Sequence, residues 1–173
     1  MKNKPNFVEI AKEDKMSSKQ ILSFKGGSQT VVLPINSVLW RFVSKQNDKK
    51  FGAYWLDTMT MQSIMRTLQA NHDYSESFKK DNIRNSLALL VDWSELNWRI
   101  KITLRKEVIA YVGNTELQKQ FKVVPNAFPF GGDDKIEKVT ETRLGGHVQY
   151  VVPRFEGLPD SNECANVELM VHV

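Results

Sequence analysis

WRIKITLR, residues 98–105, is the stretch of the chain that decides the fold. Its apolar residues fall at every second position: Trp98, Ile100, Ile102 and Leu104. Because successive side chains of a strand point to opposite faces, this alternation predicts a half-buried β-strand with one face on a core. The other face carries Arg99, Lys101 and Arg105, and we expect it to be solvated rather than to form a binding stripe for anions.

Further β segments precede this strand. Gln20–Phe24 and Gln29–Leu33 are predicted as strands on either side of a Gly-Gly turn. Val38–Val43 is rich in β-branched and aromatic residues, and Gly52–Leu56 continues in the same style. The basic, turn-forming run at residues 45–50 indicates that these last two segments form a hairpin.

The middle of the chain changes to a helical period. An apolar stripe recurs at helical spacing: Met61, Ile64, Met65 and Leu68. It predicts an amphipathic helix that begins near Thr58 or Thr60, with its methionines in the core. The polar run Asn71–Ser77 ends this helix, and a second helix is predicted from Ser77 to about Val91. The residues that it is expected to bury are Phe78, Ile83, Leu87 and Leu90.

Strands return in the last part of the chain. Val108–Val112 is predicted as a strand that ends at Gly113-Asn114. Phe121–Asp134 contains two prolines and a glycine pair, so it is predicted as a long loop. His147–Val152 and Val167–Val173 are predicted as the closing strands.

Length and composition bound the architecture. A chain of 173 residues, 41% hydrophobic and 25% charged, fits one globular domain over 1–173. Residues 1–19 are predicted as a flexible or short helical extension. The expected class is α+β, a split antiparallel β core with helices from the 58–91 region packed on it. No signal peptide and no run of membrane-spanning length is visible, so we expect no membrane partner.

Charge and metal-ligating residues exclude several functions. A formal charge of +4 favours encounter with anions but lacks the dense basic footprint of a nucleic-acid binder. The lone Cys164 suits a reducing compartment and is interpreted as an inert thiol. His72, His147 and His172 are scattered, so we expect no metal site.

Three distant segments look like parts of one pocket. They are Val38–Phe42, Gly52–Trp55 and Gly145–Tyr150. Each places one polar side chain, namely Arg41, Tyr54 or Gln149, inside an aromatic or apolar run. Such a combination is typical of a cleft for a flat, charged, phosphate-bearing ligand, because arginine binds diphosphate bidentately and aromatic rings stack on flat bases.

The same segments resemble the ADP-ribosyltransferase superfamily. Val38–Phe42 is similar to its first strand, Gly52–Trp55 to the glycine-aromatic segment that follows, and Val108–Gly113 with Gln118 to its middle strand. Gly145–Pro153 resembles the late strand of the subgroup typified by the tuberculosis necrotizing toxin and related polymorphic-toxin domains. In that subgroup a glutamine stands where other members have a catalytic glutamate.

The resemblance implies specific roles. Arg41, Tyr54 and Gln149 are the implied catalytic residues, and NAD is the implied substrate. The implied NAD-binding residues are Arg41, Trp40, Tyr54, Trp55, Gly145 and Gly146. The chain lacks the serine-threonine-serine segment of arginine-specific transferases and any Gln-x-Glu or Glu-x-Glu in place of Gln149, which argues against transfer to arginine.

Three functions follow as expectations. The first is an NAD-consuming toxin domain that cleaves the nicotinamide–ribose bond, with NAD glycohydrolase activity favoured. The alternatives are a mono-ADP-ribosyltransferase that modifies a protein or nucleic acid, and a non-enzymatic RNA- or protein-binding module that uses the basic face of residues 98–105. The toxin hypothesis also implies a cognate immunity protein, delivery as part of a larger secreted or injected effector, and action in a cytoplasm.

Overall fold

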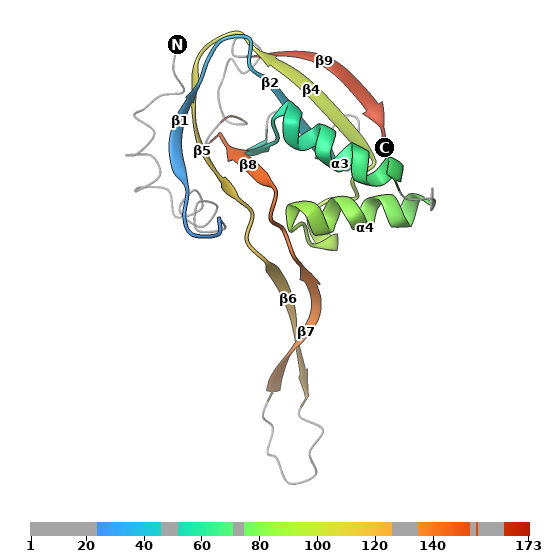
Figure 1. Cartoon of the computed structure of the whole chain (residues 1–173). Helices are drawn as coiled ribbons and strands as arrows, with labels where there is room; N and C mark the ends of the chain where they lie inside the picture. Colours follow the sequence, from blue (N-terminus) through green and yellow to red (C-terminus); the bar gives the residue numbers. More distant parts are fainter. Residues whose placement is uncertain (1–23, 46–51, 71–74, 126–134, 153–154, 156–164) are drawn as a thin grey trace.

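A computed structural model describes residues 24–45, 52–70, 75–125, 135–152, 155 and 165–173 (Figure 1). These residues form antiparallel sheets and two α-helices, α3 (Thr58–Ala70) and α4 (Glu76–Leu87), with a short 3-10 helix η1 (Val91–Trp93). The predicted α+β class is confirmed. The predictions for residues 1–19, the basic run at 46–50, His72 and Cys164 lie outside the described residues.

The strands divide among three sheets. A four-stranded sheet has the order β1-β5-β8-β3, formed by Gln29–Leu33, Val108–Asn114, Val148–Val151 and Tyr54–Trp55. A three-stranded sheet has the order β2-β4-β9, formed by Val38–Val43, Trp98–Leu104 and Ala165–His172. The third sheet is the β6-β7 hairpin, formed by Gln118–Pro125 and Lys135–Arg143.

The strand predicted over 98–105 is confirmed as β4, the centre of its sheet. Ile100, Ile102 and Leu104 are fully buried between this sheet and the four-stranded one. The opposite face is less solvated than expected. Arg99 Nη1 donates to Met65 Sδ of α3 at 3.4 Å, and Lys101 forms an ion pair with Glu168 of β9. The alternating pattern therefore identified the strand and its buried face, but Arg99 and Lys101 on the basic face are partly buried through contacts with α3 and with Glu168.

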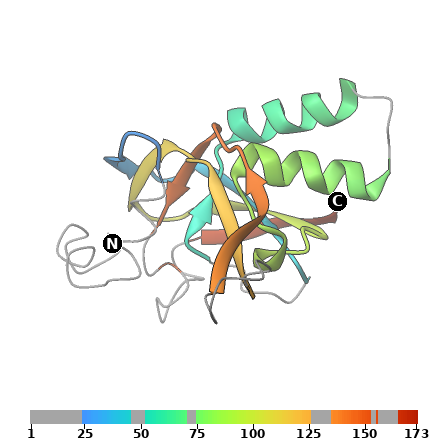
Figure 2. The same ribbon diagram turned by 90° about the horizontal axis from the view of Figure 1, so that it is seen from below.

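Both helices pack on the face of the β2-β4-β9 sheet that points away from the four-stranded sheet (Figure 2). The predicted stripe of α3 is confirmed, since Met61, Ile64 and Leu68 are buried. Asp57 Oδ1 accepts the Thr60 N–H at 2.7 Å and caps the first turn.

The second helix is shorter than predicted. It begins one residue earlier than expected and ends at Leu87, because Ala88 adopts a left-handed conformation with φ of 53° and its N–H bonds the Arg84 carbonyl. Leu90 is buried outside the helix, and Phe78 is half-buried. The chain then turns into η1, whose first residue, Val91, is the predicted end of the helix.

The predicted hairpin of residues 38–43 with 52–56 is reduced to one isolated antiparallel bridge between Trp40 and Leu56. β2 pairs with β4, and β3 pairs with β8, so the two segments belong to different sheets. Of the strand predicted over 20–24, residues 20–23 lie outside the described residues. Phe24 bridges to Thr115, and β1 pairs with β5. Burial of apolar faces on distant strands outweighed the local turn signals.

The predicted loop over 121–134 is also corrected. Residues 121–125 belong to β6, which pairs with β7 along its full length; residues 126–134 lie outside the described residues. The hairpin leads on from β5 and back into β8, and it projects well beyond the rest of the molecule (Figure 1). The predicted strands at 108–112, 147–152 and 167–173 are confirmed as β5, β8 and β9 with small shifts of boundary.

Neither α-helix in the described part of the chain is long and apolar enough to cross a membrane.

Candidate functional site

A cleft opens where the two larger sheets separate. β2 and β3 are edge strands of their sheets. Within the described residues they share one isolated bridge, in which Trp40 and Leu56 exchange two backbone hydrogen bonds of 2.8 Å. Apart from this bridge, β2 pairs with β4 and β3 pairs with β8, and side chains from both edge strands line the split between the sheets.

The cleft contains a cavity of about 280 Å³. Its walls come from β2, β3, β8, the end of α4, η1 and the segment that follows β5. All three side chains singled out in the sequence, Arg41, Tyr54 and Gln149, line this one cavity. The structure therefore brings Gln149 together with Arg41 and Tyr54, which precede it by about one hundred positions in the chain.

Arg41 lies on β2 with its guanidinium against Gly52. Gly52 is buried and carries no side chain, so the arginine head occupies the space above its α-carbon. The Trp55 indole N–H donates to the Gly52 carbonyl at 2.5 Å and fixes this backbone. The glycine beside Tyr54 thus shapes the position of the cation.

The aromatic residues of the site differ in burial. Tyr54 and Trp40 are half-buried in the cavity wall, and the Trp40 indole N–H donates to Thr58 Oγ1 at 3.3 Å. Trp55 borders the cavity but is fully buried, with an edge-on contact to Phe155 at 5.7 Å between ring centroids. We therefore regard Trp55 mainly as a core residue that supports the wall.

Gln149 lies on β8, opposite Gly113 of β5, and is 4% exposed. A buried amide that borders a cavity has donors and an acceptor available for a polar ligand. Its backbone position is fixed by two neighbouring strands, because β8 lies between β5 and β3. The arrangement makes Gln149 a buried polar group of fixed backbone position in the cavity wall.

Gly145 and Gly146 do not line the cavity. Gly145 N–H donates to the Asn85 carbonyl at 2.7 Å, and Gly146 N–H donates to Thr115 Oγ1 at 2.9 Å. Gly145 has φ of 70°, and a Cβ there would lie 2.7 Å from the Thr115 carbonyl oxygen. Only glycine fits this turn, which ties the start of β8 to α4 and to the end of β5.

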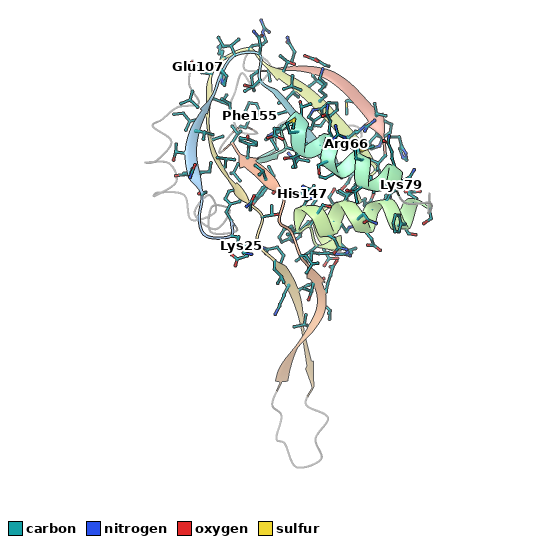
Figure 3. All side chains as sticks on the ribbon, in the orientation of Figure 1. Lys25, Arg66, Lys79, Glu107, His147 and Phe155 are labelled. Carbon is teal, nitrogen blue, oxygen red and sulfur yellow. The ribbon has the colours of Figure 1, made fainter. Side chains whose placement is uncertain are left out.

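His147 lies in the same turn, between the end of α4 and β8 (Figure 3). Its carbonyl accepts the Thr115 N–H at 3.0 Å. Burial lowers the pKa of the imidazole below its ordinary value. These contacts agree with the structural role predicted for this histidine.

Several cavity residues were missed in the sequence. They are Ser44, Leu87, Ala88, Leu89, Trp93, Ser94, Thr115 and Glu116. Glu116 lies two residues beyond the end of β5 and is exposed. It is the one carboxylate among the described lining residues, as Arg41 is the one cation. Gln118, noted with the middle strand, also lines the cavity. Most of these residues lie at or just beyond the ends of helices and strands, without recognisable motifs, so sequence spacing gave no signal for them.

The η1 turn, which carries Trp93, is joined to β7 by a polar contact. Val91 N–H donates to Glu141 Oε2 of β7 at 3.1 Å. Arg143 Nε donates to the other oxygen of Glu141 at 2.5 Å. Burial on its own raises the pKa of Glu141, but these two contacts outweigh it and leave the pKa below its ordinary value.

The cavity thus offers one guanidinium, aromatic walls, a buried amide and a carboxylate. This set can bind a ligand that carries negative charge and flat rings, and it can stabilise positive charge that develops next to Glu116 or Tyr54. Among the described residues no group of three or more His, Cys, Asp or Glu side chains is placed to hold a metal ion.

The fold resembles a known structure. The chain matches a solved structure of "Rhs1-CT in complex with cognate immunity protein RhsI1" with a TM-score of 0.51, over 87% of this chain and 84% of that chain, at 10% identity. The two chains share a fold. No family model and no curated protein matches the sequence.

Proposed function

We propose that the chain is an NAD-consuming toxin domain with an ADP-ribosyltransferase-like fold that hydrolyses the nicotinamide–ribose bond. The observation that carries the proposal is the convergence of Arg41, Tyr54 and Gln149 on one cavity. The toxin aspect is supported by the shared fold with Rhs1-CT, which was solved with an immunity protein. By analogy, a cognate immunity partner and delivery into the cytoplasm of a target cell belong to the same proposal.

The reaction requires no acid for the leaving group. The bond between the ribose C1′ and the pyridinium nitrogen breaks, and its electron pair neutralises the nicotinamide ring. Water then bonds to C1′ and releases a proton to solvent, which leaves ADP-ribose and nicotinamide. Since the transition state is oxocarbenium-like, as in glycoside cleavage, positioning and electrostatics are the protein's main task.

Each residue has a role in this scheme. Arg41 binds the diphosphate with its planar guanidinium. The absence of a side chain on Gly52 leaves the space that the guanidinium occupies. Tyr54 stacks on the nicotinamide ring, and Trp40 adds a second aromatic wall. Gln149 hydrogen-bonds the ribose hydroxyls, and as an uncharged amide it cannot act as a general base.

Transfer of ADP-ribose to a macromolecule is the second candidate. Glu116 favours it, because an exposed carboxylate at the cavity can take a proton from an acceptor nucleophile. The binding module that uses the basic face of β4 has less support, since Lys101 is paired with Glu168 and Arg99 lies against Met65.

Nicotinamide release from NAD by purified protein tests the proposal. We expect the parent to turn over NAD and the Gln149→Ala variant to do so with a turnover rate about 100-fold lower. Gln29→Ala, at an exposed position of β1, is the matched control. Labelled NAD in cell extract should give free ADP-ribose. A discrete labelled macromolecule that resists chase with unlabelled NAD would instead establish transfer. If the protein neither turns over NAD nor binds it in calorimetry, both activities are rejected.

A further inference from the structure

Trp93 is a large aromatic residue that the structure leaves exposed beside the cavity. Its side chain is 56% exposed, yet it belongs to the cavity lining. An exposed tryptophan in the wall of a binding site forgoes burial of a large apolar surface, which normally contributes to stability. A ligand surface that covers the ring recovers this contribution.

The turn that carries Trp93 is held in place on three sides. Arg84 of α4 is buried and donates from Nη2 to the Ser94 carbonyl at 2.9 Å. Ser44, at the end of β2, accepts the Glu95 N–H at 2.9 Å, and its hydroxyl lies 3.3 Å from that of Ser94. On the third side stands the Glu141 contact to Val91 already described.

Further contacts strengthen this support. Gln120 of β6 donates to the Asp92 carboxylate, and Trp93 N–H donates to the Leu90 carbonyl at 3.0 Å. Such a supported ring is preorganised, so a ligand can stack on it without ordering the backbone first.

The size of the cavity points to the kind of ligand that uses this ring. At about 280 Å³ the cavity lies near the lower limit of the roughly 300–1,000 Å³ typical of small-molecule sites. Because a dinucleotide carries two nucleoside halves, we expect one of them to lie on the rim of a cavity of this size. Trp93 is the exposed aromatic ring among the described lining residues, whereas Trp40 and Tyr54 are half-buried.

We infer that Trp93 is the stacking platform for the adenine ring of the dinucleotide. Arg41 binds the diphosphate, and the nicotinamide riboside half enters the cavity toward Tyr54 and Gln149. Ser44 and Ser94, which also line the cavity beside this turn, offer hydroxyls to the adenosine ribose. The inference rests on the proposed function and makes Trp93 a residue that selects dinucleotides over mononucleotides.

The kinetic test compares NAD with nicotinamide mononucleotide, which lacks the adenosine half. Trp93→Ala should raise KM for NAD by about tenfold or more, as loss of one base–aromatic stack predicts, with a smaller change in kcat. The loss of kcat/KM should be at least about tenfold larger for NAD than for nicotinamide mononucleotide. Trp93→Phe should recover most of the affinity for NAD. Val91→Ala is the matched control, because it is exposed on the same turn but does not line the cavity.

A binding test separates this inference from the proposed reaction. ADP-ribose and AMP should quench the tryptophan fluorescence of the parent far more than that of Trp93→Phe, and ribose 5-phosphate should quench neither. If the parent binds ADP-ribose through Trp93 but releases no nicotinamide, the adenine platform stands and the hydrolase proposal falls. The platform would be overturned if Trp93→Ala lost kcat/KM equally for NAD and for nicotinamide mononucleotide. An unchanged affinity of Trp93→Ala for ADP-ribose would overturn it as well.

Discussion

The guanidinium of Arg41 occupies the place where a side chain on Gly52 would begin. A Cβ built on Gly52 would lie 1.1 Å from Arg41 Nη1 and 2.0 Å from Cζ. Arg41 lies within β2, whereas Gly52 precedes β3. The two segments were expected to form one hairpin, yet these residues meet by close approach of a side chain to the backbone rather than by strand pairing. Glycine at position 52 is therefore a condition for the orientation of the arginine.

Gly52→Ala should uncouple activity from stability. The atoms that a methyl group would meet are at the far end of a flexible side chain, so the arginine can swing away at small cost to folding. We expect a change in the free energy of unfolding below about 1 kcal/mol and a loss of about tenfold or more in kcat/KM for NAD. Urea unfolding and nicotinamide release measure the two effects. A large loss of stability would show that Arg41 is held rigidly in place.

Arg41→Lys keeps the positive charge but loses the planar fork. Hydrogen bonds to charged groups contribute about 1.5–3 kcal/mol, so we expect NAD affinity to fall by about 10- to 100-fold. Calorimetric titration with ADP-ribose measures this without turnover. Unchanged affinity would make Arg41 an ordinary strand residue.

Glu116→Gln tests whether the exposed carboxylate contributes to bond cleavage. The carboxylate favours positive charge on the ribose in the transition state, and the neutral amide of similar shape does not. Because Glu116 is exposed and screened by solvent, we expect a loss of about tenfold in kcat, with KM affected less. Glu107→Gln is the matched control, since Glu107 precedes the opposite end of β5 (Figure 3). Equal rates for the two variants would exclude Glu116 from the reaction.

Stability should decrease in mild acid because of His147. Burial lowers the pKa of this imidazole in the folded state, so the unfolded chain binds a proton first as the pH falls. The contribution is present above the ordinary histidine pKa of about 6.5 and is lost below it, down to the folded pKa. Urea unfolding at pH 8 and pH 5 should show a smaller difference for His147→Gln than for the parent. An identical difference would mean that His147 does not control this transition.

Local patterns predicted the elements, and non-local pairing decided the site. The period of two over 98–105 and the apolar stripe that starts at Met61 depend on neighbouring residues, and both became the expected elements. The basic turn after β2 predicted pairing with the segment that becomes β3. β2 pairs instead with β4, which offers a longer apolar face than the two-residue β3. β6 was missed because prolines and glycines near 125–134 outweighed its own strand signal.

The same contrast applies to the cavity. Arg41, Tyr54 and Gln149 were found because each interrupts an apolar strand with one polar group. Trp93 and Glu116 reach the cavity from turns, whose course depends on contacts such as that of Arg84 with Ser94. Sequence spacing carries no information on such contacts.

The pairing of β3 with β8 sets the order in which the site can appear during synthesis. Arg41 and Tyr54 leave the ribosome about one hundred residues before Gln149, and β3 has no partner in its sheet until β8 has emerged. Bringing β3 and β8 together closes a long loop, and the entropy cost of this closure is offset only once their contacts have formed. We therefore expect the site to form late in folding. A nascent chain that has not yet reached Val148 lacks both the late strand and its amide. The cell that makes this protein therefore meets a complete site only after nearly all of the described strands have been translated.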